Sequence, residues 1–187
     1  MAKFFGNLNL VMLVGLIAAL ALIFGMHGDM VTGNTIGRWL HLFFGVLWIG
    51  LLYYLNFVQV PLMPSIPDEL KPAVGGHIAP KVLFYFRWAA LGTVITGLYV
   101  AWASGYVHQA LMLQQPFAMI GVGMWMALIM AANVWFIIWP NQKKVLGIVE
   151  ATAEAKAAAG KIALMASRTN TLLSLPMFYA MVNANHG

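Results

Sequence analysis

Long runs of hydrophobic residues, bounded by charged ones, dominate this chain and predict helices that cross a membrane. No charged residue occurs between Arg38 and Asp68, and none between Arg87 and Lys143. A helix needs about 20 largely apolar residues to cross the hydrocarbon core of a bilayer. The second run is too long for one helix, and the segment 105–115 divides it. We therefore expect five spans, at about residues 8–26, 36–60, 82–104, 116–139 and 170–185. The long apolar core of the first favours a retained helix over a signal peptide.

The segment between the fourth and fifth spans has a different composition, because it combines many alanines with charged residues. These charged residues are Lys143, Lys144, Glu150, Glu154, Lys156, Lys161 and Arg168. The pattern predicts a helical segment at residues 141–168 outside the membrane. Because lysines concentrate in cytoplasmic connections, we expect this segment, the connection with Lys71 and Lys81, and the N-terminus to be cytoplasmic. The prediction is an all-α polytopic transmembrane helix bundle, N-in and C-out, with residues 1–187 as a single transmembrane domain.

Composition supports a membrane protein and excludes several kinds of cofactor site. Hydrophobic residues make up 62% of the chain and charged residues only 8%, whereas soluble domains carry about 25% charged residues. The mean hydropathy is +0.83. The net charge of +5 comes from sparse basic residues near span ends, where lipid headgroups explain them, so nucleic acid is not an expected partner. The chain has no cysteine, which excludes disulfides, iron–sulfur clusters and c-type haem attachment.

His41 is the histidine most clearly inside an expected span, and polar groups there are functional candidates by default. On a helical wheel it shares a narrow stripe with five other residues, and Arg38 lies one turn before it. The stripe contains Gly45, Trp48, Leu52, Asn56 and Gln59. Because the opposite side of this helix is apolar, we expect the stripe to face the interior of the bundle.

A haem group accounts for this stripe economically. The imidazole of His41 can supply an axial ligand, and Gly45 leaves room for a flat macrocycle beside the backbone. Arg38 can pair with a propionate near the aqueous end. On the expected topology His186 emerges on the same membrane side, which makes it the candidate second ligand, whereas His77 lies on the other side. The expected cofactor-binding residues are His41, His186, Arg38, Gly45 and Trp48, with His41 and His186 as metal ligands.

Two other interpretations of the histidines remain open. His41 can simply hydrogen-bond a neighbouring helix. Alternatively, an outer cluster of His27, His41, His108 and His186 can bind copper or zinc, since imidazole suits both metals. Arg87 has two interpretations as well, because it either extends to the lipid headgroups or pairs with an anion inside the bundle. The thirteen methionines are interpreted as packing residues.

Several segments, in order, resemble the membrane domain of the bacterial membrane-bound urate oxidase (urate hydroxylase, PuuD) family. They are RWLH at 38–41, GVLWIG at 45–50, FRW at 86–88 leading to TG at 96–97, IWPNQKK at 138–144, RTN at 168–170, LP at 175–176 and MVNANH at 181–186. The resemblance covers most of the chain, and the last element is the most specific. Members of that family continue into a C-terminal cytochrome c domain, which we expect this chain to lack. The helix with His41 and Trp48 also resembles, more loosely, helices of HemJ-type and CopD-like membrane proteins.

The resemblance implies a membrane-bound redox protein that carries haem b in the bacterial inner membrane. Such a protein either oxidises a small molecule or passes electrons to a separate cytochrome. Because no cytochrome c domain is expected, a cytochrome or oxidase subunit, or a homo-oligomer, is the expected partner besides the lipid bilayer. The alternative is an accessory transmembrane subunit of a larger respiratory or oxidase complex, without a cofactor of its own. The catalytic residues and the substrate are not predicted.

Overall fold

The computed structural model describes residues 1–184, apart from the side chains of His27 and Asp29, and every regular element in this part of the chain is a helix. The chain divides into two compact units, Met1–Ile36 and Gly37–Gly187. The first unit contains α1 (Ala2–Phe5), α2 (Leu8–Leu22), the π-helical turn η1 (Ile23–His27), the 3-10 turn η2 (Gly28–Met30) and the first residues of α3 (Gly33–Tyr53).

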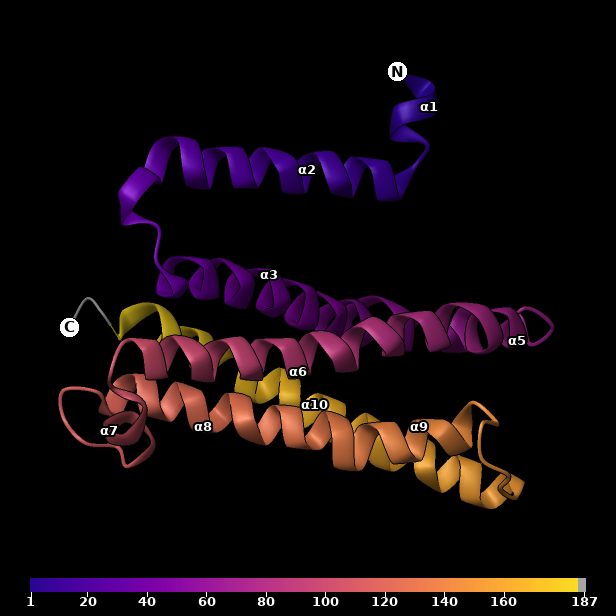
Figure 1. Cartoon of the computed structure of the whole chain (residues 1–187). Helices are drawn as coiled ribbons and strands as arrows, with labels where there is room; N and C mark the ends of the chain where they lie inside the picture. Colours follow the sequence, from indigo (N-terminus) through magenta and orange to yellow (C-terminus); the bar gives the residue numbers. More distant parts are fainter. Residues whose placement is uncertain (185–187) are drawn as a thin grey trace. The chain divides into compact units, whose positions relative to one another are not determined.

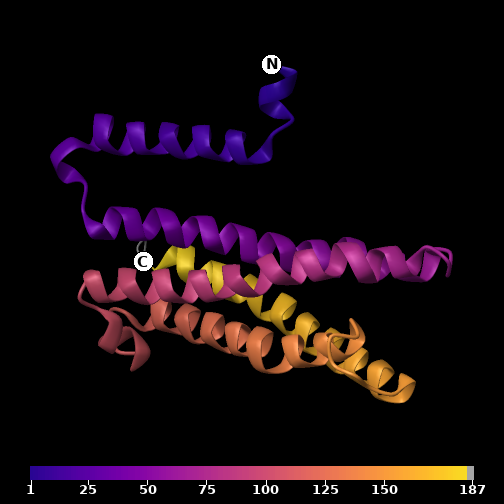
Figure 2. The ribbon, with the colours of Figure 1, turned by 45° about the vertical axis from the view of Figure 1, so that its right-hand side comes forward.

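The second unit continues α3 and holds all the later helices. They are η3 (Tyr54–Gln59), α4 (Val60–Leu62), η4 (Met63–Ser65), α5 (Lys71–Ala73), η5 (Val74–Ile78), α6 (Ala79–Ala103), α7 (Val107–Leu111), α8 (Ala118–Ala132), η6 (Asn133–Ile138), α9 (Trp139–Val145) and α10 (Ala153–Asn183). In both views α6 and α8 run side by side, and α10 packs along α8 and α9 (Figure 1, Figure 2). The π-helical turns η3, η5 and η6 continue directly into α4, α6 and α9, so several short elements form single long rods.

Four helical stretches in the described part of the chain are long and apolar enough to cross a membrane. They are Leu8–Met26, Gly33–Ser65, Lys71–Ala103 and Ala118–Val145. The first has the bounds that the sequence predicts, and the next three contain most of the predicted spans but extend beyond at least one end of each. Apart from Asn9, α2 carries no polar side chain, as suits a helix surrounded by lipid. The class of protein is therefore an all-helical, multi-pass membrane protein.

The charged segment 141–168 does not form a helix of its own. The helix that ends with α9 stops at Val145, and Gly147 adopts a φ of +73° that only glycine accepts readily. α10 then begins after Thr152, whose hydroxyl accepts a hydrogen bond from the backbone N–H of Ala155 at 3.2 Å. This single helix of 31 residues joins much of the segment expected outside the membrane to the segment expected as a fifth span.

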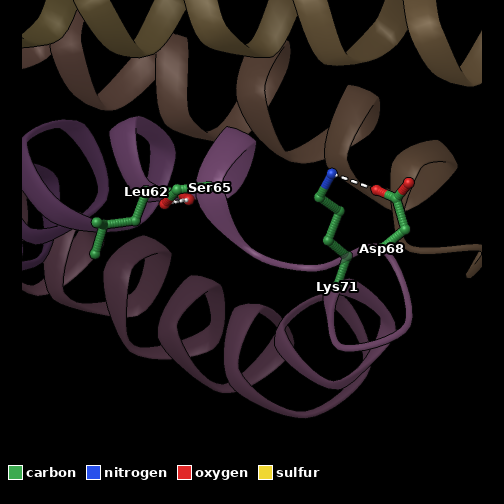
Figure 3. A network of polar contacts seen from close by, with 4 residues as sticks. All are labelled: Leu62, Ser65, Asp68 and Lys71. Carbon is green, nitrogen blue, oxygen red and sulfur yellow. Dashed lines mark hydrogen bonds and ion pairs between the residues drawn. The ribbon is translucent and has the colours of Figure 1, made fainter.

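The loop between η4 and α5 is closed by short polar contacts between residues three apart (Figure 3). The hydroxyl of Ser65 donates to the carbonyl of Leu62 at 2.8 Å. The ammonium of Lys71 forms an ion pair with Asp68, and these are the only ion-paired side chains among the described residues. The loop therefore connects the long helical stretch Gly33–Ser65 to the stretch Lys71–Ala103, which runs back in the opposite direction.

The core of the second unit combines large apolar side chains with a few buried polar bonds between helices. Trp48, Leu52 and Phe86 are almost completely buried. Asn170, also fully buried, donates to the carbonyl of Met130 at 2.9 Å and accepts from the amide of Asn133 at 3.0 Å. These bonds fix α10 beside the middle of the apolar stretch Ala118–Val145.

Two further bonds join α10 to the rod that starts with α3. The hydroxyls of Tyr53 and Ser174 lie 2.8 Å apart, and the Asn56 amide donates to the Ser167 hydroxyl at 2.8 Å. Inside a membrane no water is available to hydrogen-bond these hydroxyl and amide groups. Their pairing therefore specifies which helix faces pack together. α10 is therefore bonded to neighbours on two sides.

Candidate functional site

The imidazole of His41 is held by the backbone of α6. Its Nδ1 atom lies 2.9 Å from the carbonyl oxygen of Thr93, and the hydroxyl of Thr96 lies 3.4 Å from the same nitrogen. A carbonyl oxygen can only accept, so Nδ1 carries the proton and donates it. In the neutral ring Nε2 then has a free lone pair. This is the tautomer that a histidine needs in order to bind a metal through Nε2.

A glycine on α6 makes room for this ring. A Cβ atom at Gly97 would lie 2.7 Å from Cε1 of His41 and 3.0 Å from Nδ1, closer than side chains tolerate. The same arrangement recurs along these antiparallel helices, at Gly37 against Tyr99 and at Gly92 against Phe44. Each glycine receives a ring from the opposite helix. This pattern sets the register of α3 against α6 and brings His41 to the carbonyl of Thr93.

His41 lines a cavity of ≈ 200 Å³ between α3, α6, α8 and α10. The polar residues around it are Arg38, His41, Thr93 and Tyr106, and apolar side chains form the rest of its wall. Two methionines also line it, Met124 from α8 and Met181 from α10. The cavity therefore offers one imidazole nitrogen, two thioether sulfurs and a single arginine. Thioethers and imidazole are both known axial ligands of haem iron.

Arg38 and Tyr106 lie together at this cavity. Arg38 is exposed, whereas Tyr106 is half-buried and stacks on Phe117 with ring centroids 5.1 Å apart. Burial raises the pKa of the Tyr106 phenol, and the nearby positive charge of Arg38 partly opposes that rise. The phenol therefore stays protonated at neutral pH and can donate a hydrogen bond beside the guanidinium. A cation with a neighbouring O–H donor suits a carboxylate at the edge of a ligand.

Among residues 1–184 the cavity brings together two of the expected cofactor-binding residues. Arg38 and His41 line the cavity, but Gly45 and Trp48 are not among its lining residues. Trp48 is fully buried in the core with Leu52 and Asn56, which confirms that the stripe faces the bundle interior. A Cβ atom at Gly45 would lie 3.9 Å from the nearest atom, which is ordinary contact, so this glycine is not a tight position.

The other histidines contribute nothing to this cavity within residues 1–184. His186 lies outside the described residues, His27 belongs to the other compact unit, and His108 on α7 is exposed. His77 precedes Gly97 by twenty residues, about 30 Å along a helix, and so cannot share a metal with His41. Over the part of the chain that the structure describes, no three His, Cys, Asp or Glu residues are grouped to hold a metal ion.

Sequence reasoning missed the residues that other helices contribute. The cavity beside His41 is also lined by residues of later elements, namely Thr93 and Gly97 of α6, Tyr106, Met124 of α8 and Met181 of α10. On the last helix Met181 lines the cavity, whereas Tyr179, two residues before it, is exposed. A signal was present in the Thr96–Gly97 pair, because a hydroxyl followed by glycine is a common place for helices to approach closely.

The family model for the urate oxidase N-terminal domain matches residues 90–187, slightly more than half of the chain. No curated protein and no solved structure matches this chain. The chain belongs to the urate oxidase N-terminal family, which confirms the resemblance seen in the sequence. Gly97, Tyr106, Met124 and Met181 fall within the matched region, whereas Arg38 and His41 precede it.

Proposed function

We propose that this chain is a urate-oxidase-like membrane protein that binds haem b through His41 and takes part in a redox reaction. The observation that carries the proposal is the bond from His41 Nδ1 to the Thr93 carbonyl at 2.9 Å, which leaves Nε2 free beside a lined cavity. When bound, a haem supplies one-electron and oxygen chemistry that the side chains lack.

The donor set of the cavity fits such a group. His41 would supply an axial nitrogen, and its orientation would come from the backbone of α6 rather than from a flexible side chain. Arg38 and the Tyr106 phenol would hold the propionates. The remaining wall is apolar, as haem pockets require. A cavity of ≈ 200 Å³ is smaller than common ligand pockets of about 300–1,000 Å³, so binding must enlarge it.

His186, five residues after Met181 in the sequence, would be the second residue to hold the haem iron. Met181 is the competing candidate, because its side chain lines the cavity with His41. A thioether ligand raises the reduction potential of haem relative to a second histidine. The two ligand sets therefore predict different spectra and different potentials.

We further propose five spans, with α10 as the fifth, in the inner membrane of a bacterium. Asn170 supports this arrangement, because it bonds Met130 and Asn133 in the middle of an apolar stretch that is long enough to cross the bilayer. α10 is about 46 Å long, and a hydrocarbon core of about 30 Å is shorter than that. Lysines on both sides of Val145, namely Lys143, Lys144, Lys156 and Lys161, support a cytoplasmic position for that end of the bundle, with the N-terminus inside and the C-terminus outside.

Electrons from a haem in this cavity need an acceptor. We propose a separate cytochrome or oxidase subunit, or a second copy of this chain, as the partner. The alternative function is an accessory transmembrane subunit that binds no cofactor, for which the small volume of the cavity is the supporting observation.

The absorption spectrum of the purified protein tests the proposal. A Soret band with sharp bands on reduction supports haem binding, and a colourless protein from haem-replete cells supports the accessory subunit. His41→Ala should lose the haem or give a five-coordinate spectrum, whereas His108→Ala, the exposed control, should leave it unchanged. His186→Ala and Met181→Leu distinguish the two second ligands. Wild-type haem content and spectrum in the His41→Ala protein would rule out the assignment.

A further inference from the structure

Arg87 carries a positive charge that no acidic side chain neutralises among the described residues. The only ion pair in that part of the chain joins Lys71 and Asp68. The Arg87 guanidinium instead lies over the ring of Trp139 at 3.8 Å, and one of its nitrogens reaches the carbonyl of Leu83 at 3.4 Å. This stacking fixes the plane of the guanidinium and leaves most of its N–H groups unused.

An apolar groove runs toward this arginine between α6 and α8. It has a volume of ≈ 410 Å³ and is lined mainly by Leu91 and Val94 of α6, Leu128 and Ala131 of α8, and Trp135 and Phe136 of η6. Trp88 packs edge-on against Trp135, with ring centroids 5.3 Å apart, at the end of the groove near Arg87. Trp135 therefore lines the groove and contacts Trp88, the residue that follows Arg87 on α6.

Helical periodicity makes the groove and the arginine parts of one surface. On α6, Arg87 lies one turn before Leu91. On the continuous helix from α8 to α9, Trp135, Trp139 and Lys143 follow one another at intervals of four residues. Lys143 is half-buried on this face, and Lys144 beside it is exposed. Two cations thus flank one end of a surface that is otherwise apolar and aromatic.

The length of this surface matches one leaflet of a bilayer. The helix rises about 22 Å over the fifteen steps from Leu128 to Lys143, and half of a bilayer, with its headgroup region included, measures about 20–22 Å. Leu128 lies near the middle of the apolar stretch Ala118–Val145, and Lys143 lies near its end. An acyl chain would therefore reach the middle of the membrane while its phosphate stays at the headgroup level.

We propose that this face of α6, α8 and α9 binds one anionic glycerophospholipid. An acyl chain occupies the groove, the phosphate pairs with the guanidinium of Arg87, and Lys143 supplies the second positive charge. Arginine binds a phosphate through two parallel N–H bonds. In a zwitterionic headgroup the lipid's own cation weakens this attraction, so an anionic lipid is preferred. The tryptophans hold the glycerol region at the interface, where amphipathic rings prefer to lie.

Tryptophan quenching tests the proposal in vesicles of phosphatidylcholine that contain increasing fractions of brominated-acyl phosphatidylglycerol. Trp88, Trp135 and Trp139 all surround the site and report bromine nearby. The wild type should select the phosphatidylglycerol over brominated phosphatidylcholine, and Arg87→Gln should weaken that selection about fivefold, the effect of one cation near the membrane surface. Arg168→Gln, which removes an exposed arginine of α10, is the matched control and should change nothing.

A second pair of variants keeps the test decisive if Arg87→Gln does not fold. Lys143→Gln should weaken the selection, and Lys144→Gln, one residue away on the exposed side, should not. Ala132→Phe fills the groove and should reduce quenching by the phosphatidylglycerol, whereas Val122→Phe on another exposed part of α8 should not. Equal quenching of the wild type by the two brominated lipids, or equal loss in Lys143→Gln and Lys144→Gln, would overturn the proposal.

Discussion

The Nδ1 atom of His41 on α3 lies 2.9 Å from the carbonyl oxygen of Thr93 on α6. This bond joins two antiparallel helices that are separated in the sequence by the short elements from η3 to η5. It also removes one of the two ring nitrogens from any other role, so a ligand can bind the imidazole only through Nε2. The helix packing and the chemistry of the cavity therefore depend on the same contact.

Gly97→Ala is expected to separate His41 from its backbone partner, and Gly45→Ala is not. The added methyl group at Gly97 would lie 2.7 Å from Cε1 of His41, whereas the nearest atom to a Cβ at Gly45 is 3.9 Å away. Overpacking of this kind costs about 1–3 kcal/mol. Thermal unfolding in detergent should show the loss for Gly97→Ala alone. Haem content, if haem is bound, should fall with it, and equal behaviour of the two variants would contradict the packing argument.

Asn170→Ala should destabilise the contact between α8 and α10. The variant loses the bonds to Met130 and Asn133 and leaves the half-buried side-chain amide of Asn133 without its partner on α10. The free energy of unfolding should fall by about 1–3 kcal/mol, the usual cost of leaving a buried polar group without its partner. Interhelical bonds in membranes tend toward the lower end of that range. Asn183→Ala is the matched control, because Asn183 donates only to Tyr179 of its own helix. A double-mutant cycle with Asn133→Ala should show coupling between the two amides.

Gly121→Ala should displace α7 from α8. A Cβ atom there would lie closer to the carbonyl oxygen of Ala110 than real Cβ contacts allow. This oxygen belongs to the backbone of a fully buried residue, so it cannot move aside easily. Since Tyr106 directly precedes α7, the cavity beside Arg38 should open as well. Gly50→Ala meets no atom within 4 Å and should leave the unfolding temperature unchanged or raise it. Circular dichroism during heating distinguishes the two.

The proposed orientation predicts opposite labelling of two single-cysteine variants. Ala157 and His108 are both exposed, and the natural chain has no cysteine to interfere. In intact cells a membrane-impermeant thiol reagent should modify the variant His108→Cys and spare Ala157→Cys. Lysis should make both reactive. Labelling of Ala157→Cys before lysis would reverse the proposed topology.

The sequence predicted spans well where charge marks their ends. The first expected span, residues 8–26, coincides with the apolar stretch Leu8–Met26. The flanking charges of Lys3 and Asp29 mark where the hydrophobic sequence ends. The helix of the second expected span runs instead from Gly33 to Ser65. Helix geometry continues through polar residues as long as backbone bonds are available, whereas hydropathy falls at the first charge. Charge patterns therefore locate the membrane better than they locate helix ends.

Apart from His186, which lies outside the described residues, the site was predicted only from residues of α3. A wheel of α3 identified His41, Arg38 and the buried stripe, but it contains no information about the facing helix. Gly97 and Thr93 depend on the register between α3 and α6, which three separate glycine–ring contacts determine. Met124 and Met181 look like ordinary packing residues until their helices meet at one cavity. Such contacts arise from tertiary structure and have no signature in a single helix.

Val94 and Leu128 line both the cavity beside His41 and the groove that opens between α6 and α8. These two side chains thus form part of a wall that the cavity shares with the groove. A hydrophobic reductant or inhibitor dissolved in the bilayer would meet this wall without first crossing water. Its access would depend on its mole fraction in the membrane, so a series of such compounds should rank by partition coefficient rather than by concentration in the buffer.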